Sequence, residues 1–244
     1  MAPATRPSRD AIPPRTPATP PVPVPPARQR GESFVDTERR ALLDTLRGLG
    51  PEAPTLCEGW DARDLLAHMV LRESRPDALP GIGMPQGPAG AHTARLQREL
   101  AAAEWGTLLA RFSRGPARWM PFALPGVGEA VNSAEYLVHH EDLRRAQPGW
   151  IPRTDRAVQE AAWSAVRRAG RVLHRRAPGG VVLVAPGFGR KAVKRPGEGR
   201  SSVVLTGEPV ELLLHAFGRD SVARVEITGD PGEVQAFRST PRGA

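Results

Sequence analysis

The spacing of apolar residues changes near residue 178, and this change constrains the fold more than any other feature of the sequence. From residue 33 onward, apolar residues recur three and four positions apart in segments separated by Pro/Gly-rich stretches, which is typical of amphipathic helices. Beyond residue 178, short apolar runs divided by Gly and Pro indicate strands. We therefore expect a mostly α protein, with a helical part at 33–177 and a small C-terminal α+β domain at 178–240.

Capping residues and glycines divide the helical part into five expected helices. These run from Asp36 to about Gly48, from Asp61 to about Leu71, from Thr93 to Phe112, from Asn132 or Ser133 to about Ala146, and from Thr154 to about Ala177. Residues 76–90 are rich in Pro and Gly and are expected to form a long loop, which inside a compact domain is often functional. The expected strands are Val181–Ala185, Lys191–Lys194, Ser202–Thr206 and Ala223–Thr228, with a short helix at Pro209–Phe217.

Residues 1–31 contain ten of the 27 prolines and almost no large apolar side chains. Such a segment cannot bury enough surface to offset its ordering entropy, so we expect a disordered tail. It has no apolar core of the kind found in signal peptides and no amphipathic Arg/Ser pattern of a transit peptide.

The formal net charge of +8 raises the question of nucleic-acid binding. Residues 1–31 hold +4 of this excess, and the other basic residues lie in small clusters spread along the chain. Aromatic residues make up 5% of the sequence, and no DNA- or RNA-binding motif is present. The sequence therefore predicts no nucleic-acid partner.

Cellular context follows from two further features. The single cysteine, Cys57, excludes an intramolecular disulfide and fits a reducing compartment. No apolar run approaches the roughly 18 residues that a membrane helix needs. We expect a cytoplasmic protein without a membrane partner; its oligomeric state does not follow from the sequence.

Three residues form a candidate metal site. Glu135 and His139 are four positions apart, so both project from one face of a helix and could bind one metal ion. His68 is the best third ligand, because it lies among leucines and a methionine on the expected core face of its helix. From the residues alone, a His on an apolar helix face is more often a buried neutral imidazole bonded to a backbone carbonyl than a metal ligand. Three protein ligands leave a position open, as in catalytic zinc sites.

Two runs resemble a known family. The run TLCEGWDARDLLAH at 55–68 and the run EYLVHHEDL at 135–143 resemble those of the actinobacterial DinB-like families, which include the mycothiol-dependent maleylpyruvate isomerases. The resemblance implies a DinB-like four-helix bundle in which His68, Glu135 and His139 bind a divalent metal ion, with Zn²⁺ as the first candidate. Residues 72–77, with His92 and Thr93, look closer to a metal-binding subgroup without an assigned reaction.

Other polar residues near these runs are ambiguous. Asp142 could orient a ligand imidazole, or it could pair with Arg144 or Arg145. Arg72 and Arg75 could bind an anionic substrate or thiol cofactor, or they could form a solvated helix end.

Two neighbours of the predicted ligands are expected to have no chemical role. His140 should be a surface or packing residue, because it points about 100° away from His139. Cys57 should be a packed, inert thiol without a base nearby in the sequence.

The resemblance implies a thiol-dependent isomerase or transferase that uses mycothiol and acts on a small molecule. No separate catalytic acid or base can be identified from the sequence. The alternative is a non-catalytic metal-binding protein, a sensor or carrier, on the same fold. A closed site with four protein ligands would count against catalysis.

Overall fold

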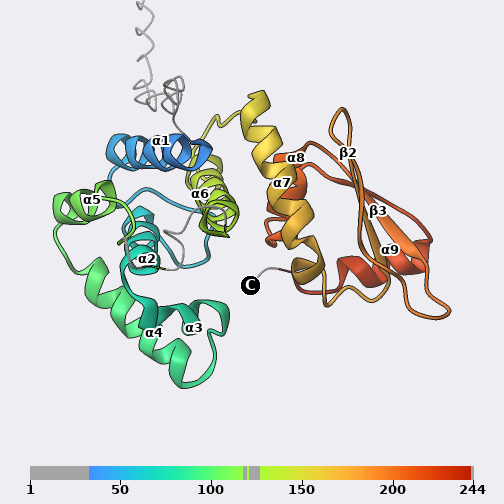
Figure 1. The fold of residues 1–244 in the computed structure, drawn as a ribbon, viewed down its shortest axis with the longest axis horizontal. Helices are drawn as coiled ribbons and strands as arrows, with labels where there is room; N and C mark the ends of the chain where they lie inside the picture. Colours follow the sequence, from blue (N-terminus) through green and yellow to red (C-terminus); the bar gives the residue numbers. More distant parts are fainter. Residues whose placement is uncertain (1–32, 118–119, 121–126, 243–244) are drawn as a thin grey trace, which may run out of the picture.

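The computed structural model describes residues 33–117, 120 and 127–242, so the predicted tail at 1–31 lies outside the described part. The chain is mostly α-helical with one small sheet, as predicted (Figure 1). Its helices are α1 Phe34–Leu49, α2 Ala62–Ser74, η1 Pro76–Ala78, α3 Leu79–Gly83, α4 Gly87–Ala101, α5 Trp105–Ser113, α6 Val127–Arg145, α7 Arg156–Leu173, α8 Pro209–Ala216 and α9 Pro231–Arg238.

The starts of α1 and α2 depend on side-chain caps. In α2, the predicted start at Asp61 is a capping box, in which the side chains of Asp61 and Asp64 each accept from the backbone N–H of the other. In α1, the prediction that Asp36 is the cap is wrong. Ser33 holds that position, and its Oγ accepts from the backbone N–H of Asp36 at 3.1 Å. Asp36 therefore lies in the first helical turn, where a carboxylate also favours the helix.

The long loop predicted at 76–90 is wrong, since η1, α3 and the start of α4 occupy most of it. Proline is tolerated in the first turn of a helix, where its missing N–H has no partner to lose. Gly81 lets α3 approach α4 closely, because a Cβ there would collide with Ala89, and Gly90 lets α4 approach the turn between the two helices, because a Cβ there would collide with Pro85. The Pro/Gly content therefore reflects short helices in close contact.

The prediction of a single helix at Thr93–Phe112 is wrong, because the helix is interrupted between the end of α4 at Ala101 and the start of α5 at Trp105. Glu104 caps α5, and its carboxylate accepts from the backbone N–H groups of Gly106 and Thr107 at 2.9 and 2.8 Å. Glutamate is not among the usual N-cap residues, so the break leaves little trace in the sequence. Helix α6 begins at Val127, before the predicted caps Asn132 and Ser133.

The strands form one mixed sheet in the order β2-β1-β3-β4. They are β1 Gly180–Ala185, β2 Gly189–Lys194, β3 Ser202–Thr206 and β4 Glu226–Thr228. β1 pairs antiparallel with β2 and parallel with β3, and β4 is antiparallel to β3. The strand predicted from Ala223 is shorter than expected, and helix α9 was not predicted.

Two hydrophobic clusters meet at α6. Tyr136 and Leu143 face a cluster built from α1, α2 and α5, whereas Leu137 and Val138 face one built from α7, α8 and the sheet. Helix α7 packs against α8 and β2, and it lies beside the sheet in Figure 1. Helix α6 thus contributes to both hydrophobic clusters and joins the two sides of the molecule. The division of the chain at 177–178 stays a prediction.

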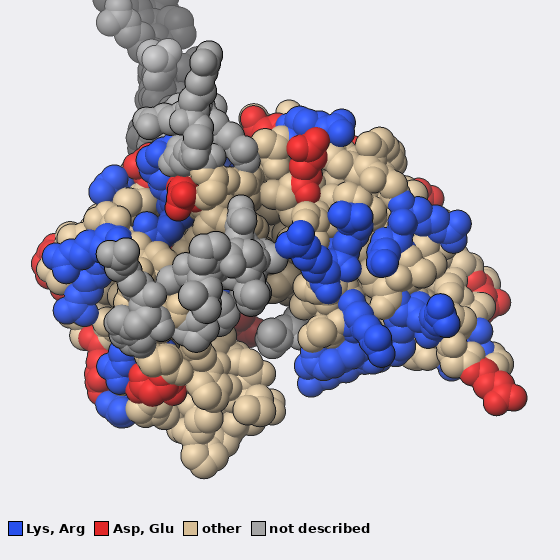
Figure 2. Space-filling view, viewed as in Figure 1, with Lys and Arg blue, Asp and Glu red and all other residues tan. Residues whose placement is uncertain are grey.

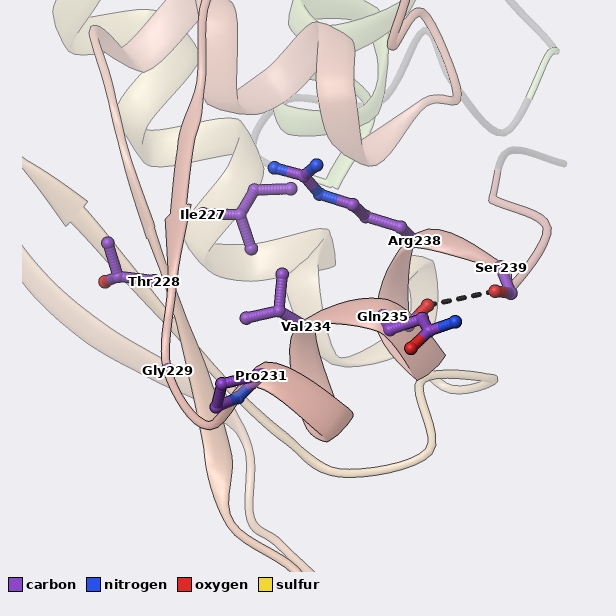
Figure 3. Close-up of a pocket in the computed structure, with 8 residues that line it drawn as sticks. All are labelled: Ile227, Thr228, Gly229, Pro231, Val234, Gln235, Arg238 and Ser239. Atoms are coloured by element: carbon purple, nitrogen blue, oxygen red, sulfur yellow. Dashed lines mark hydrogen bonds between the residues drawn. The ribbon is translucent and has the colours of Figure 1, made fainter.

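A groove of about 660 Å³ lies between β4 and α9, where Ile227 and Val234 point toward each other (Figure 3). Arg238 is the one charged residue among the residues that line it, so this groove offers no group of metal ligands. In the described residues, no helix is long and apolar enough to cross a membrane.

Candidate metal centre

The three residues predicted as metal ligands come together between α2 and α6. One potential ligand atom from each of His68, Glu135 and His139 lies within 4.8 Å of the other two. Both imidazoles are nearly buried, with His68 7% and His139 8% exposed, and their ring centroids are 5.1 Å apart. The pattern of residue types therefore brings one carboxylate and two imidazoles to a single point.

His68 is held by the start of α2. The capping box at Asp61 fixes the first turn, and the next turns bury Leu65 and Met69 in the core. The Trp60 ring packs against His68 with a centroid distance of 5.1 Å. Burial, together with the charge of nearby His139, lowers the pKa of His68 to about 3. His68 is therefore a neutral imidazole at pH 7, the form that binds metals.

His139 lies between two carboxylates. Its Nδ1 is 3.1 Å from Oδ2 of Asp142, and its Nε2 is 3.7 Å from Oε2 of Glu135. Burial opposes a charge on His139, but the hydrogen bonds with Asp142, Cys57 and Glu135 outweigh it and raise its pKa well above the ordinary value. The two carboxylates thus stabilise positive charge at the His139 imidazole. A bound metal cation could supply this positive charge in place of the proton.

Glu135 is ionised. Burial opposes its negative charge, but the hydrogen bond with His139 and the charge of Arg72 outweigh burial and lower its pKa to about 2. The Arg72 Nε lies 3.5 Å from Oε2 of Glu135, and its guanidinium also donates to Oδ1 of Asn132 at 2.8 Å. Arg72 is thus buried behind the candidate ligands.

Asp142 is fully buried and receives three donors. Its Oδ2 accepts from the Cys57 thiol at 3.2 Å, and its carboxylate forms a two-pronged ion pair with Arg219 at 2.8 and 2.6 Å. It also contacts His139. The predicted alternative, pairing with Arg144 or Arg145, is wrong, because both arginines bind Glu141.

Arg219 was missed by the sequence analysis. It follows α8 in the part of the chain to which no chemistry was assigned, and its Nη2 lies 3.5 Å from Sγ of Cys57. No local pattern marks it, because its partner Asp142 is 77 positions away. Cys57 has an imidazole nearby after all, with Sγ 3.9 Å from Nδ1 of His139.

A second group of possible metal ligands consists of Cys57, His139 and Asp142. Arg219 already occupies both oxygens of Asp142 with a fixed positive charge. A cation there would have to displace a buried ion pair, which is costly. The group with His68 and Glu135 is therefore the better metal site of the two.

The candidate site opens into a cavity of about 340 Å³. One part of its lining comes from α3, α4 and Pro85 between them and is largely apolar, whereas Phe217 and Arg219 come from the segment that follows α8. The lining residues are Cys57, Trp60, His68, Gly81, Ile82, Pro85, Gly90, Thr93, Ala94, Gln97, Glu135, Val138, His139, Phe217 and Arg219.

Arg75 and His140 are not among the residues that line the cavity. Arg75 does not line the cavity; it is exposed and paired with Asp77 at 2.8 Å. His140 is buried, so of the two predicted positions, surface or packing, it has the second; it contacts Thr45 and Glu38 at 2.9 and 2.8 Å.

Comparison with known proteins gives structural neighbours only. No family model and no curated protein sequence matches this chain. A solved structure of the mycothiol-dependent maleylpyruvate isomerase, in a variant with one histidine replaced by alanine, is 18% identical with a TM-score of 0.51. The matched region covers 80% of this chain and 89% of the isomerase chain. A second structure of the same enzyme has equal identity and coverage with a TM-score of 0.49. The match to the first of these structures shows that this chain has a related fold.

Proposed function

We propose that His68, Glu135 and His139 bind one divalent metal ion, Zn²⁺ in the first place, and that the protein is a mycothiol-dependent isomerase or transferase acting on a small molecule. The observation that carries the proposal is the convergence of three ligand atoms within 4.8 Å at the wall of a cavity. Two imidazoles and one carboxylate form a usual donor set for catalytic zinc.

The surroundings fit a metal that keeps an open position. Asp142 holds Nδ1 of His139 and leaves Nε2 directed toward Glu135, the second-sphere arrangement common for ligating histidines. The three candidate ligands belong to the cavity lining, so a further ligand can reach them from the cavity. This favours the catalytic alternative over a closed carrier site.

When bound, a divalent metal lowers the pKa of a thiol or water and provides a nucleophile at neutral pH. The thiol is proposed to be mycothiol, because the structural neighbour is named for its dependence on it. The anion-binding role predicted for Arg72 and Arg75 suits Arg219 better, since Arg219 lines the cavity. The apolar wall from α3 and α4 would exclude water from the reacting groups.

We further propose that the helical part is a DinB-like four-helix bundle. The support is that α1, α2, α5 and α6 contribute to one hydrophobic cluster. The sheet, together with α8 and α9, would form the small C-terminal domain. This part of the chain supplies Arg219 to the cavity.

The metal is tested by mass-spectrometric metal analysis of protein purified without a metal-affinity tag. We expect about one equivalent of metal in the wild type, strong loss in His68→Ala and His139→Ala, and full retention in the control His92→Ala. His92 is a matched control because it is a partly exposed histidine that pairs with Asp77 away from the cavity. If no metal binds at micromolar concentration, the proposal is wrong.

Catalysis and simple binding are separated with the cobalt-substituted protein. Addition of mycothiol should produce a thiolate-to-cobalt absorption band, and Arg219→Gln should weaken the apparent affinity for an anionic substrate without removing the metal. A metal-loaded protein that gives no such band with any low-molecular-weight thiol would favour the sensor or carrier alternative.

A further inference from the structure

Positive charge is concentrated in one stretch of the chain. Residues 156–200 hold 11 Lys and Arg against two acidic residues, Glu160 and Glu198, a net charge of +9. The whole chain has a net charge of +8, so the rest of the sequence is slightly acidic. The stretch spans α7, β1 and β2.

The fold brings together basic clusters that are separate in the sequence. Helix α7 packs on the edge strand β2, and Gly170 permits the close approach, because a Cβ there would collide with Val193. A groove of about 810 Å³ lies between the two elements. It is lined by Arg167, Arg171, Arg175, Lys191, Ala192, Val193, Lys194 and Arg195.

The cations form two rows. Arg167 and Arg171 are four positions apart on α7, so they lie about 6 Å apart along the helix, and Arg175 follows in the turn after the end of α7. Lys191 and Arg195 belong to the strand side. Lys194 is fixed across the groove, since its Nζ donates to the carbonyl oxygens of Arg175, at 3.0 Å, and Ala177.

These charges are not compensated. No carboxylate lines the groove, and within the described ranges none forms an ion pair with its six cations. Ion pairs occur at the margins, where Arg156 binds Glu160 and Arg200 binds Glu233. Figure 2 shows Lys and Arg gathered over the half of this face formed by α7 and the sheet, with acidic residues toward its edges.

We propose that the groove between α7 and β2 binds the phosphate backbone of duplex nucleic acid without reading its sequence. Two rows of cations can flank one phosphodiester strand, and arginine presents a fork that fits phosphate. No aromatic side chain lines the groove, so it has no platform on which unpaired bases could stack. A flat bilayer surface would reach only the rims, and Val172 is the one large apolar side chain exposed on α7.

This proposal opposes the sequence-based prediction of no nucleic-acid partner, which stays untested. That prediction used the spread of basic residues along the chain, and it did not consider their arrangement in space. The proposal is independent of the metal site, because none of its residues lines the metal cavity.

The test is fluorescence anisotropy of a labelled duplex DNA with the full chain at increasing salt. Each neutralised phosphate contributes a slope of about −0.9 to the dependence of log K on log salt, so five contacts predict a slope of about −4 to −5. The variant Arg171→Gln/Lys191→Gln/Arg195→Gln should bind at least about ten-fold more weakly at low salt, with a slope smaller by about 3.

The matched control is Arg98→Gln/Arg111→Gln/Arg114→Gln, which has the same net charge as the groove variant but changes exposed residues in α4, in α5 and directly after α5. It should bind like the wild type. Circular dichroism and metal content establish that both variants are folded. Equal loss in both variants, no loss in the groove variant, no binding by the wild type, or tighter binding to phosphatidylserine vesicles than to DNA would each overturn the proposal.

Discussion

The metal-site cavity and the basic groove handle charge in opposite ways. At the cavity, the lining residues Glu135, His139 and Arg219 are mostly buried, as is Asp142 behind them, and each contacts a partner of opposite charge. In the groove, the charges have one sign, and all but Lys194 belong to exposed residues. The cavity is lined mainly by helices and the groove lies between helix α7 and strand β2, and the charges of the lining residues differ accordingly.

The difference teaches where a single substitution should matter. A buried charge loses its hydration, so removing its partner leaves a large uncompensated cost. Exposed like charges repel each other only weakly in water, and salt screens the repulsion. Stability should therefore depend on the cavity residues, whereas the groove residues should matter for binding.

The largest effect is expected for Asp142→Asn. The substitution removes the negative charge that Arg219 and His139 contact and should lower the free energy of unfolding by about 3–5 kcal/mol. Urea denaturation with a chelator present measures this in a single metal-free state. The control Asp44→Asn, which breaks an exposed pair with Arg47, should cost less than about 1 kcal/mol. Equal effects of the two variants would break the contrast.

The next effect concerns pH and the buried carboxylate of Glu38. Burial opposes its ionisation, but Arg153 and His140 outweigh burial and lower its pKa to about 2 from an ordinary value of 4.5. A lowered folded-state pKa gives stability that is present above pH 4.5 and is lost as pH falls toward 2. The shift corresponds to about 3 kcal/mol.

Glu38→Gln should therefore destabilise the protein by about 3 kcal/mol at neutral pH, and the difference from wild type should shrink as pH falls from 4.5 to 2. Chemical denaturation at several pH values measures it. Glu160→Gln removes an exposed partner of Arg156 and should show less than about 1 kcal/mol at any pH. A difference for Glu38→Gln that stays constant with pH would contradict the assigned pKa.

The sequence indicated much of the candidate site, because its ligands follow local rules. Glu135 and His139 share a helix face by their spacing, and the capping box at Asp61 placed His68 on a helix. Arg219 escaped because its contact with Asp142 joins two distant segments, and no periodicity records such a contact. The polar shell of a site is therefore harder to predict than its ligands.

The fold shows the same limit. Strand Ser202–Thr206 matches its prediction, since a buried apolar run between turns is a local signal. The helices between 76 and 90 were predicted as a loop, because the Pro and Gly residues that start and pack short helices are also typical of loops. The groove could not be predicted at all, since the packing of Gly170 on Val193 is what unites its clusters.

The smallest effect is expected in the groove itself. Arg171→Gln/Lys191→Gln removes two exposed charges from a crowded set of like sign, so it should change the free energy of unfolding by less than about 0.5 kcal/mol. The variant should be more stable than the wild type at low salt, because it removes repulsion between cations of the groove. The difference should vanish at high salt, because salt screens this repulsion. Urea denaturation at two salt concentrations measures it. Marked destabilisation would mean that these side chains hold α7 on β2, and the contrast between a paired cavity and an unpaired groove would no longer hold.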